Sequence, residues 1–167
     1  VIFILAILVA LVVGVGNYVL DEARRKNTVA IQAILMDAVQ KFYDEFDNYP
    51  ADQDPPSDTY SNPEQSAGVL LHYLTGNNVF DAEDLNYLGY SGDSDDLRQR
   101  IQELLLPTLR NLPEDAFETG ATFFSDGYGN AIRYENDGGL GGQPVLISAG
   151  ADKDYDDDKD NIRSDGR

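Results

Sequence analysis

The sequence predicts an α+β fold in which a long N-terminal α-helix packs on a small antiparallel β-sheet. Residues 1–46 contain no proline and open with an unbroken apolar run. Residues 131–135 and 143–148 are short, rich in β-branched and aromatic residues, and joined by a glycine-rich segment, as expected of a hairpin. A helical insertion precedes these strands, and an aspartate-rich loop at 149–162 follows them.

Composition narrows the classes of function for these 167 residues. The formal net charge of −18 argues against a nucleic-acid partner, because phosphate binding requires clustered Lys and Arg. The absence of cysteine excludes disulfides, thiolate metal sites and a thiol nucleophile. The single histidine, His72, sits in an apolar run, where a structural role is favoured over a catalytic one. We therefore expect a protein that is not an enzyme.

Residues 1–23 are predicted to form an apolar projecting helix that acts as a membrane anchor or a filament core. A helix that is apolar all round must be buried on every side, in lipid or inside an assembly. A signal-peptide core would be shorter and followed by a cleavage site of small residues. A buried core helix would need more partner surface than the remaining chain offers. Because the chain begins inside the apolar run, without an initiator Met or a basic flank, we expect further residues upstream.

Gly14 and Gly16 mark the weakest point of this helix, since each glycine costs about 1 kcal/mol relative to alanine. Two compatible interpretations stay open: close packing of a neighbouring helix, or a place where the helix stretches or melts. We expect a stretched or non-helical segment within residues 13–18 of the assembled form.

The second half of the helix belongs to a globular domain, residues 24–167. Its apolar residues recur at intervals of three and four and so share one face, whereas charged residues such as Asp37 and Lys41 fill the other face. Pro50 is expected to end the helix, because it disfavours a helical conformation at Tyr49. The predicted buried face consists of Ala30, Ile31, Ile34, Leu35, Ala38, Val39, Phe42 and Phe46.

Residues 51–122 form the helical insertion of this domain. It contains a short helix at 67–76 that is closed by Gly76, the residue type that most often terminates a helix in the left-handed conformation. A second helix at 95–106 is expected to stop at Pro107. The segment between the two helices is predicted to be rich in turns.

The C-terminal loop holds six aspartates between Asp152 and Asp160. Their alternation resembles an EF-hand, but Asp157 replaces the turn glycine, Arg163 replaces the bidentate glutamate, and no helices flank the loop. Carboxylates this close repel one another unless a cation neutralises them, and ligands that are all oxygen favour Ca²⁺. A solvated acidic tail is the alternative. An epitope-tag remnant is disfavoured, because an Asn-Ile pair follows the acidic run.

Four segments carry a family resemblance. They are the long helix with Asn48-Tyr49-Pro50, Ser125-Asp-Gly-Tyr-Gly-Asn-Ala-Ile-Arg-Tyr134, Ile147-Ser-Ala-Gly-Ala-Asp152 and Asp160-Asn-Ile162. Together they resemble the major pseudopilin of type II secretion systems, within the wider type IV pilin class. That family has Tyr-Pro after its helix, an Asp-Pro-Trp-Gly-Asn-Pro turn before a strand, and a Ser-Leu-Gly-x-Asp-Gly loop that closes with Asp-Asp-Ile. The resemblance covers residues 1–50 and 124–162 and does not explain the insertion.

The resemblance implies a pilin-like fold and a structural subunit of a helical filament. The apolar helices of such subunits pack in the centre of the fibre after an ATPase-driven machine draws them from the inner membrane. The implied partners are other copies of the chain, the inner membrane before assembly, and the secretion or pilus assembly machinery. The implied location is the inner membrane and then a periplasmic or extracellular filament. A membrane-anchored, calcium-dependent extracytoplasmic binding module is the alternative, and self-assembly distinguishes the two.

The resemblance also implies a calcium site in the acidic loop. In the family, calcium is bound by the aspartate of the Ser-Leu-Gly-x-Asp motif, by the later Asp-Asp pair and by loop carbonyls. The corresponding positions are Asp152, Asp160 with Asn161, and the carbonyl of Ala149. One or more of Asp154, Asp156 and Asp158 are expected to join them from the intervening aspartates, and Asn161 stands where the family has a carboxylate.

Overall fold

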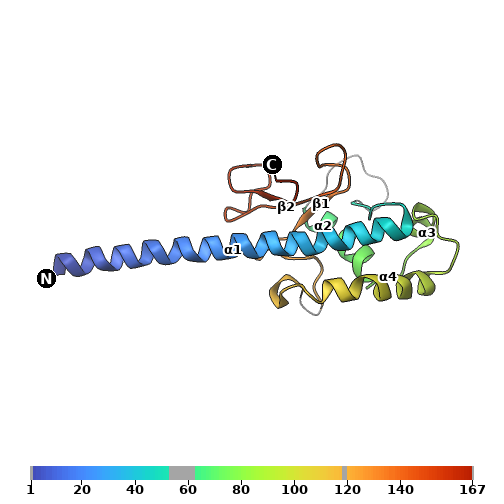
Figure 1. Ribbon diagram of the computed structural model, residues 1–167, viewed down its shortest axis with the longest axis horizontal. Helices are drawn as coiled ribbons and strands as arrows, with labels where there is room; N and C mark the ends of the chain where they lie inside the picture. The colour runs from blue at the N-terminus through green and yellow to red at the C-terminus, as the bar shows by residue number, and fades with distance from the viewer. Residues whose placement is uncertain (1, 53–62, 118–119, 167) are drawn as a thin grey trace.

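The computed structural model describes the backbone of residues 2–52, 63–117 and 120–166 and the side chains from Val15 onward. Helix α1, Ile2–Phe46, runs through 45 residues without interruption, and its first half projects well beyond the globular part (Figure 1). The prediction of one long N-terminal helix is confirmed. It ends where predicted, because Asp47 adopts a left-handed φ of 56°.

The projecting half of α1 is α-helical through Gly14 and Gly16 in the single chain. The expected stretching of residues 13–18 concerns the assembled form and stays a prediction. The side chains of the apolar run up to residue 14 lie outside the described set. A search of the described residues for a helix able to cross a membrane finds none.

In its described residues, 51–52, 63–117 and 120–122, the insertion between α1 and the sheet contains three further helices and a short 3₁₀ turn. Helix α2 spans Pro63–Thr75 and ends at Gly76, whose φ of 60° confirms the predicted glycine terminus. Helix α4 spans Ser94–Leu109 and η1 spans Glu114–Ala116. Helix α3, Ala82–Tyr87, replaces part of the segment that was expected to consist of turns.

The expected stop at Pro107 is wrong. Helix α4 continues through this proline to Leu109, and the Arg110 N–H donates to the Leu106 carbonyl at 3.0 Å. A proline in the last turn removes one backbone hydrogen bond without blocking the residues that follow it. The helix therefore ends one turn later than the sequence suggests.

The sheet is antiparallel, with the order β1-β2-β3. Strand β1 is Arg133–Glu135, β2 is Val145–Ser148 and β3 is Ile162–Arg163. The first two strands confirm the predicted hairpin, with Tyr134 opposite Leu146. The third strand was not predicted, and it pairs Ile162 with Ser148. The α+β class and the packing of the long helix on a small antiparallel sheet are thus confirmed.

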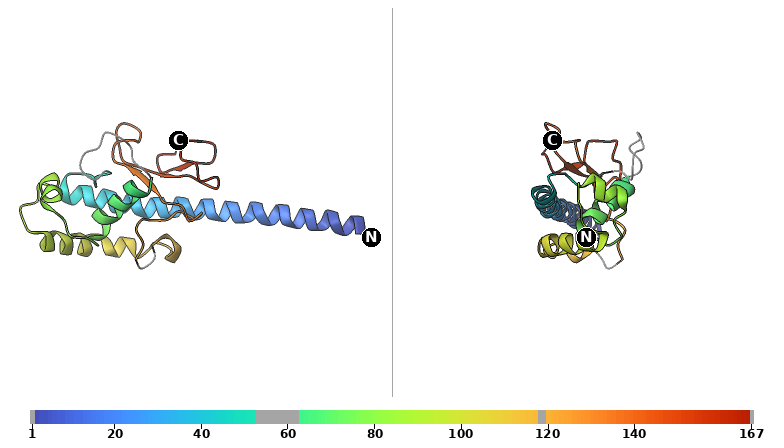
Figure 2. Two further views of the ribbon diagram at one scale, coloured as in Figure 1. Left: turned by 180° about the vertical axis from the view of Figure 1, so that it is seen from behind. Right: turned by 90° about the vertical axis from the view of Figure 1, so that its right-hand side faces the viewer.

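The core lies between the second half of α1, the helices α2 and α4, and the sheet (Figure 2). Most of the predicted face of α1 is buried as expected, although Ala30 is exposed and Ile34 and Phe46 are only partly buried. The fully buried side chains of α1 pack with residues from every other layer. These partners include Leu70, Leu74, Leu97, Ile101, Leu105, Ile132, Tyr134 and Leu146.

His72 is partly buried and its ring packs against aromatic residues of the core. Its ring centroid is 4.3 Å from that of Phe80, and its Nε2 is 3.5 Å from the Asp84 carboxylate. Within the described residues its Nδ1 is buried without a hydrogen-bond partner.

Candidate metal centre

The acidic residues form a loop between two paired strands and not a free tail. Strand β2 ends at Ser148, β3 begins at Ile162, and these two residues face each other in the sheet. Both ends of the loop are therefore fixed. Residues 149–161 are therefore not a free tail, whereas the choice between a solvated and a cation-bound loop stays a prediction.

Asp160 closes the loop on itself. Its Oδ2 accepts hydrogen bonds from the backbone N–H groups of Ala151 at 2.8 Å and Asp152 at 3.1 Å. Gly150 makes this closure possible, because a Cβ at this position would lie 2.5 Å from the Asp160 carbonyl oxygen. Its φ of 67° also favours glycine.

Further aspartates stabilise the turns of the loop through their own backbone. The Asp152 carboxylate accepts from the Asp154 N–H at 2.9 Å, and the Asp154 carboxylate accepts from the Asp156 N–H at 2.9 Å. Such side-chain contacts two residues along the chain are the usual role of aspartate in turns. Part of the acidic run is therefore explained without a cation.

Two buried side-chain oxygens of the loop have no hydrogen-bond partner among the described residues, and they belong to adjacent residues. They are Oδ1 of Asp160 and Oδ1 of Asn161. The Asn161 amide nitrogen donates to the Tyr155 carbonyl at 3.2 Å, which fixes the orientation of the amide. A buried acceptor without a partner lowers the stability of the fold by about 1–3 kcal/mol. Binding of a positively charged group to both oxygens would remove this cost. A carboxylate and an amide oxygen are ligands that Ca²⁺ accepts, so the residues fit this cation.

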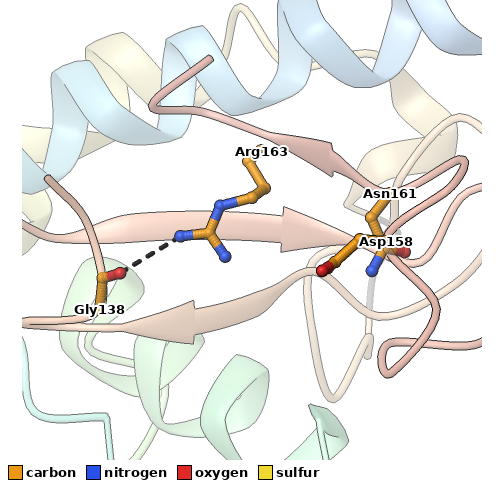
Figure 3. A pocket seen from close by; sticks show the side chains of 4 residues that line it. All are labelled: Gly138, Asp158, Asn161 and Arg163. Carbon is orange, nitrogen blue, oxygen red and sulfur yellow. Dashed lines mark hydrogen bonds between the residues drawn. The ribbon is translucent and has the colours of Figure 1, made fainter. Parts of the chain in front are cut away.

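Asp158 lies with Asn161 at a pocket of about 360 Å³, together with Gly138 and Arg163 (Figure 3). The Arg163 guanidinium is held by Asp165, at 3.1 and 3.3 Å, and its Nη2 donates to the Gly138 carbonyl at 3.2 Å. The positive charge on this wall of the pocket is therefore already compensated by a carboxylate.

Asp152 and Ala149, two further predicted ligands, are placed less favourably for binding a cation than Asp160 and Asn161. Asp152 is exposed, and Ala149 is fully buried. Within the described part of the chain, no three acidic, histidine or cysteine side chains converge on a common point. The carboxylates of Asp152, Asp158 and Asp160 are thus not gathered into one set. A cation here would depend on Asp160 and Asn161, with carbonyl oxygens and water completing its coordination.

Asp126, which the sequence pattern did not single out, connects this loop to the rest of the fold. Only 2% of Asp126 is exposed. Its Oδ1 accepts from the N–H groups of Tyr128 and Asn130, both at 2.8 Å, and its Oδ2 accepts from the Ser148 hydroxyl. The Gly150 N–H donates to the Ser148 oxygen at 3.1 Å, and the Asn130 amide donates to the Gly150 carbonyl at 2.9 Å. Asp126 therefore holds the turn before β1 against the start of the acidic loop.

The same turn docks on α1. The Gly127 N–H donates to the Thr28 hydroxyl at 3.0 Å, and the Tyr128 hydroxyl donates to the Asp21 carboxylate at 2.9 Å. A Cβ on Gly127 would lie 2.3 Å from the Arg24 carbonyl oxygen, so only glycine permits this approach. Hydrogen bonds thus run from the acidic loop through Asp126 to the helix.

Gln32 ties α1 directly to the strands that frame the acidic loop. It is 2% exposed, and its side-chain amide donates to the Leu146 carbonyl at 3.2 Å and the Ile162 carbonyl at 2.7 Å. One helix residue thereby connects β2 and β3.

Tyr155 anchors the middle of the acidic loop. Its hydroxyl donates to the carbonyl of Ala131. Burial, together with the nearby Asp126 and Glu64 carboxylates, raises the pKa of Tyr155 to about 12. Burial and the hydrogen bond to Asp21 likewise raise the pKa of Tyr128 to about 12. Both hydroxyls therefore stay protonated, and able to donate, throughout the physiological range.

In comparisons with known proteins, no family model, no curated protein and no solved structure matches the chain.

Proposed function

We propose that the protein is the structural subunit of a helical, pilin-like or pseudopilin filament, assembled through its N-terminal helices and stabilised by Ca²⁺. The observation that carries this proposal is the division of α1 into a buried half and a projecting half (Figure 1). The described part of the projecting half exposes large apolar side chains: Val15 at 56%, Tyr18 at 71%, Val19 at 58% and Leu20 at 58%.

Such a surface requires a partner. Full burial of one Val or Leu side chain stabilises an assembly by about 1.5–3 kcal/mol, so several on one helix favour lateral packing. The helix before residue 24 is about 33 Å long at 1.5 Å per residue, long enough to contact several neighbours. Identical copies of the same helix offer the same apolar surface, and repeated packing with a constant offset produces a fibre.

The cation is proposed to stabilise the domain that surrounds this filament core. Asp160 and Asn161 would hold Ca²⁺ through their unpartnered oxygens, with Asp152, Asp158 and the Ala149 carbonyl as the other candidate ligands. The cation supplies positive charge that the loop lacks. Because Asp126 connects this loop to the turn that docks on α1, a closed loop also favours the docked helix.

The calcium part is tested by thermal unfolding of the full chain in non-ionic detergent, with calcium and with chelator. A ligand at a hundredfold excess over its dissociation constant stabilises the folded protein by about 2.7 kcal/mol. At 2–4 °C per kcal/mol for a chain of this size, the melting temperature should rise by roughly 5–11 °C.

Asp160→Asn should abolish most of this calcium-dependent rise. Asp137→Asn is the matched control, because Asp137 is exposed in the loop between β1 and β2. If chelator leaves the melting curve of the unmodified protein unchanged, calcium has no role.

The proposed assembly into a filament is tested by removing detergent from the full chain and imaging the product by negative-stain electron microscopy. We expect fibres of constant diameter. Val19→Glu should prevent them, whereas Leu140→Glu should not, although Leu140 is equally exposed at 57%, because it lies on the sheet side of the domain. Isolated particles from the unmodified chain would instead favour a monomeric, calcium-dependent binding module.

A further inference from the structure

Arg24 and Arg25 stand out in a chain whose formal net charge is −18. Both are exposed, and neither forms a salt bridge with the described residues, whereas the adjacent Lys26 pairs with Glu22 at 3.3 Å. Arg25 acts electrostatically on the Tyr128 hydroxyl, which donates to Asp21, but no carboxylate of the described residues pairs with either guanidinium. Both charges are therefore available to a partner outside the chain.

The two arginines lie on the domain-facing side of α1. They precede Thr28 by four and three residues and therefore share its helix face. Thr28 is fully buried beneath the turn that contains Gly127, and this turn contacts the Arg24 carbonyl. Figure 2 shows that the N-terminal part of α1 extends alone beyond the domain. Arg24 and Arg25 are exposed where the domain first contacts α1, and the surface around their side chains is here called the notch.

The opposite end of the domain is acidic. It is formed by the end of α1 and the starts of α3 and α4, which lie together far from the N-terminus (Figure 1). The Asn48 amide donates to the Tyr87 carbonyl at 3.1 Å, and the Phe80 N–H donates to the Ser94 hydroxyl at 2.9 Å, so these elements are adjacent. The carboxylates of this acidic end are Asp44, Glu45, Asp47, Asp81, Glu83, Asp84, Asp93, Asp95 and Asp96.

Few basic side chains offset this charge. In the described residues of the acidic end, Arg100 pairs with Glu45 and Arg98 pairs with Asp95. Asp44 and Glu83 are exposed and form no salt bridge there. The acidic end thus carries a surplus of negative charge, which is the complement of the unpaired arginines.

We propose that the notch binds the acidic end of a second copy of this chain, in a head-to-tail contact that rests on the proposed filament. Such a contact joins two different surfaces, so it repeats without closing and extends along one axis. The distance from Arg25 to Asp47 along α1 is about 33 Å at 1.5 Å per residue, and this sets the axial offset between the docked copies.

The acidic loop modulates this contact, because it is bonded through Asn130 to Asp126, beside the turn that contacts the Arg24 carbonyl. Its exposed carboxylates, Asp154, Asp156 and Asp158, repel an approaching acidic surface. A bound divalent cation offsets part of that charge. Head-to-tail docking is therefore strengthened by calcium and weakened by salt, which screens the attraction between exposed charges.

The test uses charge reversal and its rescue in the full chain, with the pelletable fraction after detergent removal as the readout. Arg24→Glu/Arg25→Glu should lower this fraction about tenfold or more at low salt, because like charges then face each other. Asp44→Lys/Glu83→Lys should do the same. Combining both pairs should restore assembly to within about threefold, since the attraction is re-formed with opposite sign.

Two controls separate docking from folding and from charge alone. Arg110→Glu reverses an exposed arginine outside the notch and should assemble like the unmodified chain. Circular dichroism should show equal helix content and melting temperature for all soluble variants. The apolar substitution Val19→Glu reports on the filament independently, because it leaves both charged surfaces intact.

The outcomes are distinguishable. If the unmodified chain forms no fibres, the proposed filament fails and the docking with it. If it forms fibres and the Arg24→Glu/Arg25→Glu variant assembles equally well, only the docking is overturned. Docking is also overturned if the combined variant is not rescued. In that case, loss of binding to phosphatidylglycerol vesicles by the arginine variant would assign the arginines to lipid headgroups.

Discussion

Replacing Asp126 by asparagine tests the connection between the acidic loop and the helix with almost no change in volume. The buried carboxylate accepts hydrogen bonds on both oxygens, from two backbone N–H groups and from the Ser148 hydroxyl. Asparagine keeps one acceptor oxygen, but its amide nitrogen replaces the other. That nitrogen then faces the Ser148 hydroxyl and the Asn130 amide, which is itself a donor at 3.4 Å.

The expected loss of stability in the Asp126→Asn variant follows from these contacts. Hydrogen bonds to a charged group contribute about 1.5–3 kcal/mol each, and a buried donor left without an acceptor costs about 1–3 kcal/mol. Ser148 can rotate to accept from the new amide, which recovers part of the loss. We expect Asp126→Asn to lower the free energy of unfolding by about 3 kcal/mol, or roughly 6–12 °C in melting temperature.

The assay is thermal unfolding followed by circular dichroism, with calcium titrated in parallel. Asp137→Asn is the matched control and should change the free energy of unfolding by less than about 0.5 kcal/mol. Asp126→Asn should also weaken calcium binding, because the start of the loop loses its support. A melting temperature equal to that of the control, or unchanged calcium affinity, would refute the proposed connection.

Three further predictions use the same assay. Gln32→Leu should cost about 2–3 kcal/mol, because it leaves two strand carbonyls unsatisfied in the core; an effect below 1 kcal/mol would contradict that role. Gly127→Ala should be strongly destabilising through its clash with α1, whereas Gly16→Ala, with nothing within 4 Å, should be neutral or stabilise the helix by about 1 kcal/mol. The raised pKa of Tyr155 predicts a stability contribution that is complete below pH 10, the pKa of an unfolded tyrosine, and is lost as the pH rises towards about 12. Tyr155→Phe should flatten this alkaline loss, measured by unfolding between pH 9 and 12.

Elements with a strong repeating pattern were predictable from the sequence. The buried face of α1 follows from spacing alone, and the β1–β2 hairpin follows from two strand-like segments around glycines. Strand β3 contains two residues, too few for an alternating pattern. Helix α3 is also short, although Asp81 and Asp84 form a capping box that was readable in the sequence.

The polar residues of the candidate site were harder to predict. Gln32 interrupts the apolar pattern of α1 and is buried only because two carbonyls, 114 and 130 residues away in sequence, accept its amide protons. Asp126 was recognisable as a turn residue, but its burial depends on contact with Ser148 from strand β2. Asp160 and Asn161 were identified by resemblance, whereas their unpartnered oxygens emerge only from the folded loop.

The central claim, that the projecting helices of different copies pack against one another, is tested most directly by thiol cross-linking. The chain has no cysteine, so a single cysteine in place of Leu8 or Leu11 provides a unique reactive site. In assembled protein, a short bifunctional thiol reagent should yield covalent dimers at both positions, and a cysteine in place of Leu140 should yield none. Unlinked chains at Leu8 and Leu11, under conditions where each thiol reacts fully with a monofunctional reagent, would contradict the filament.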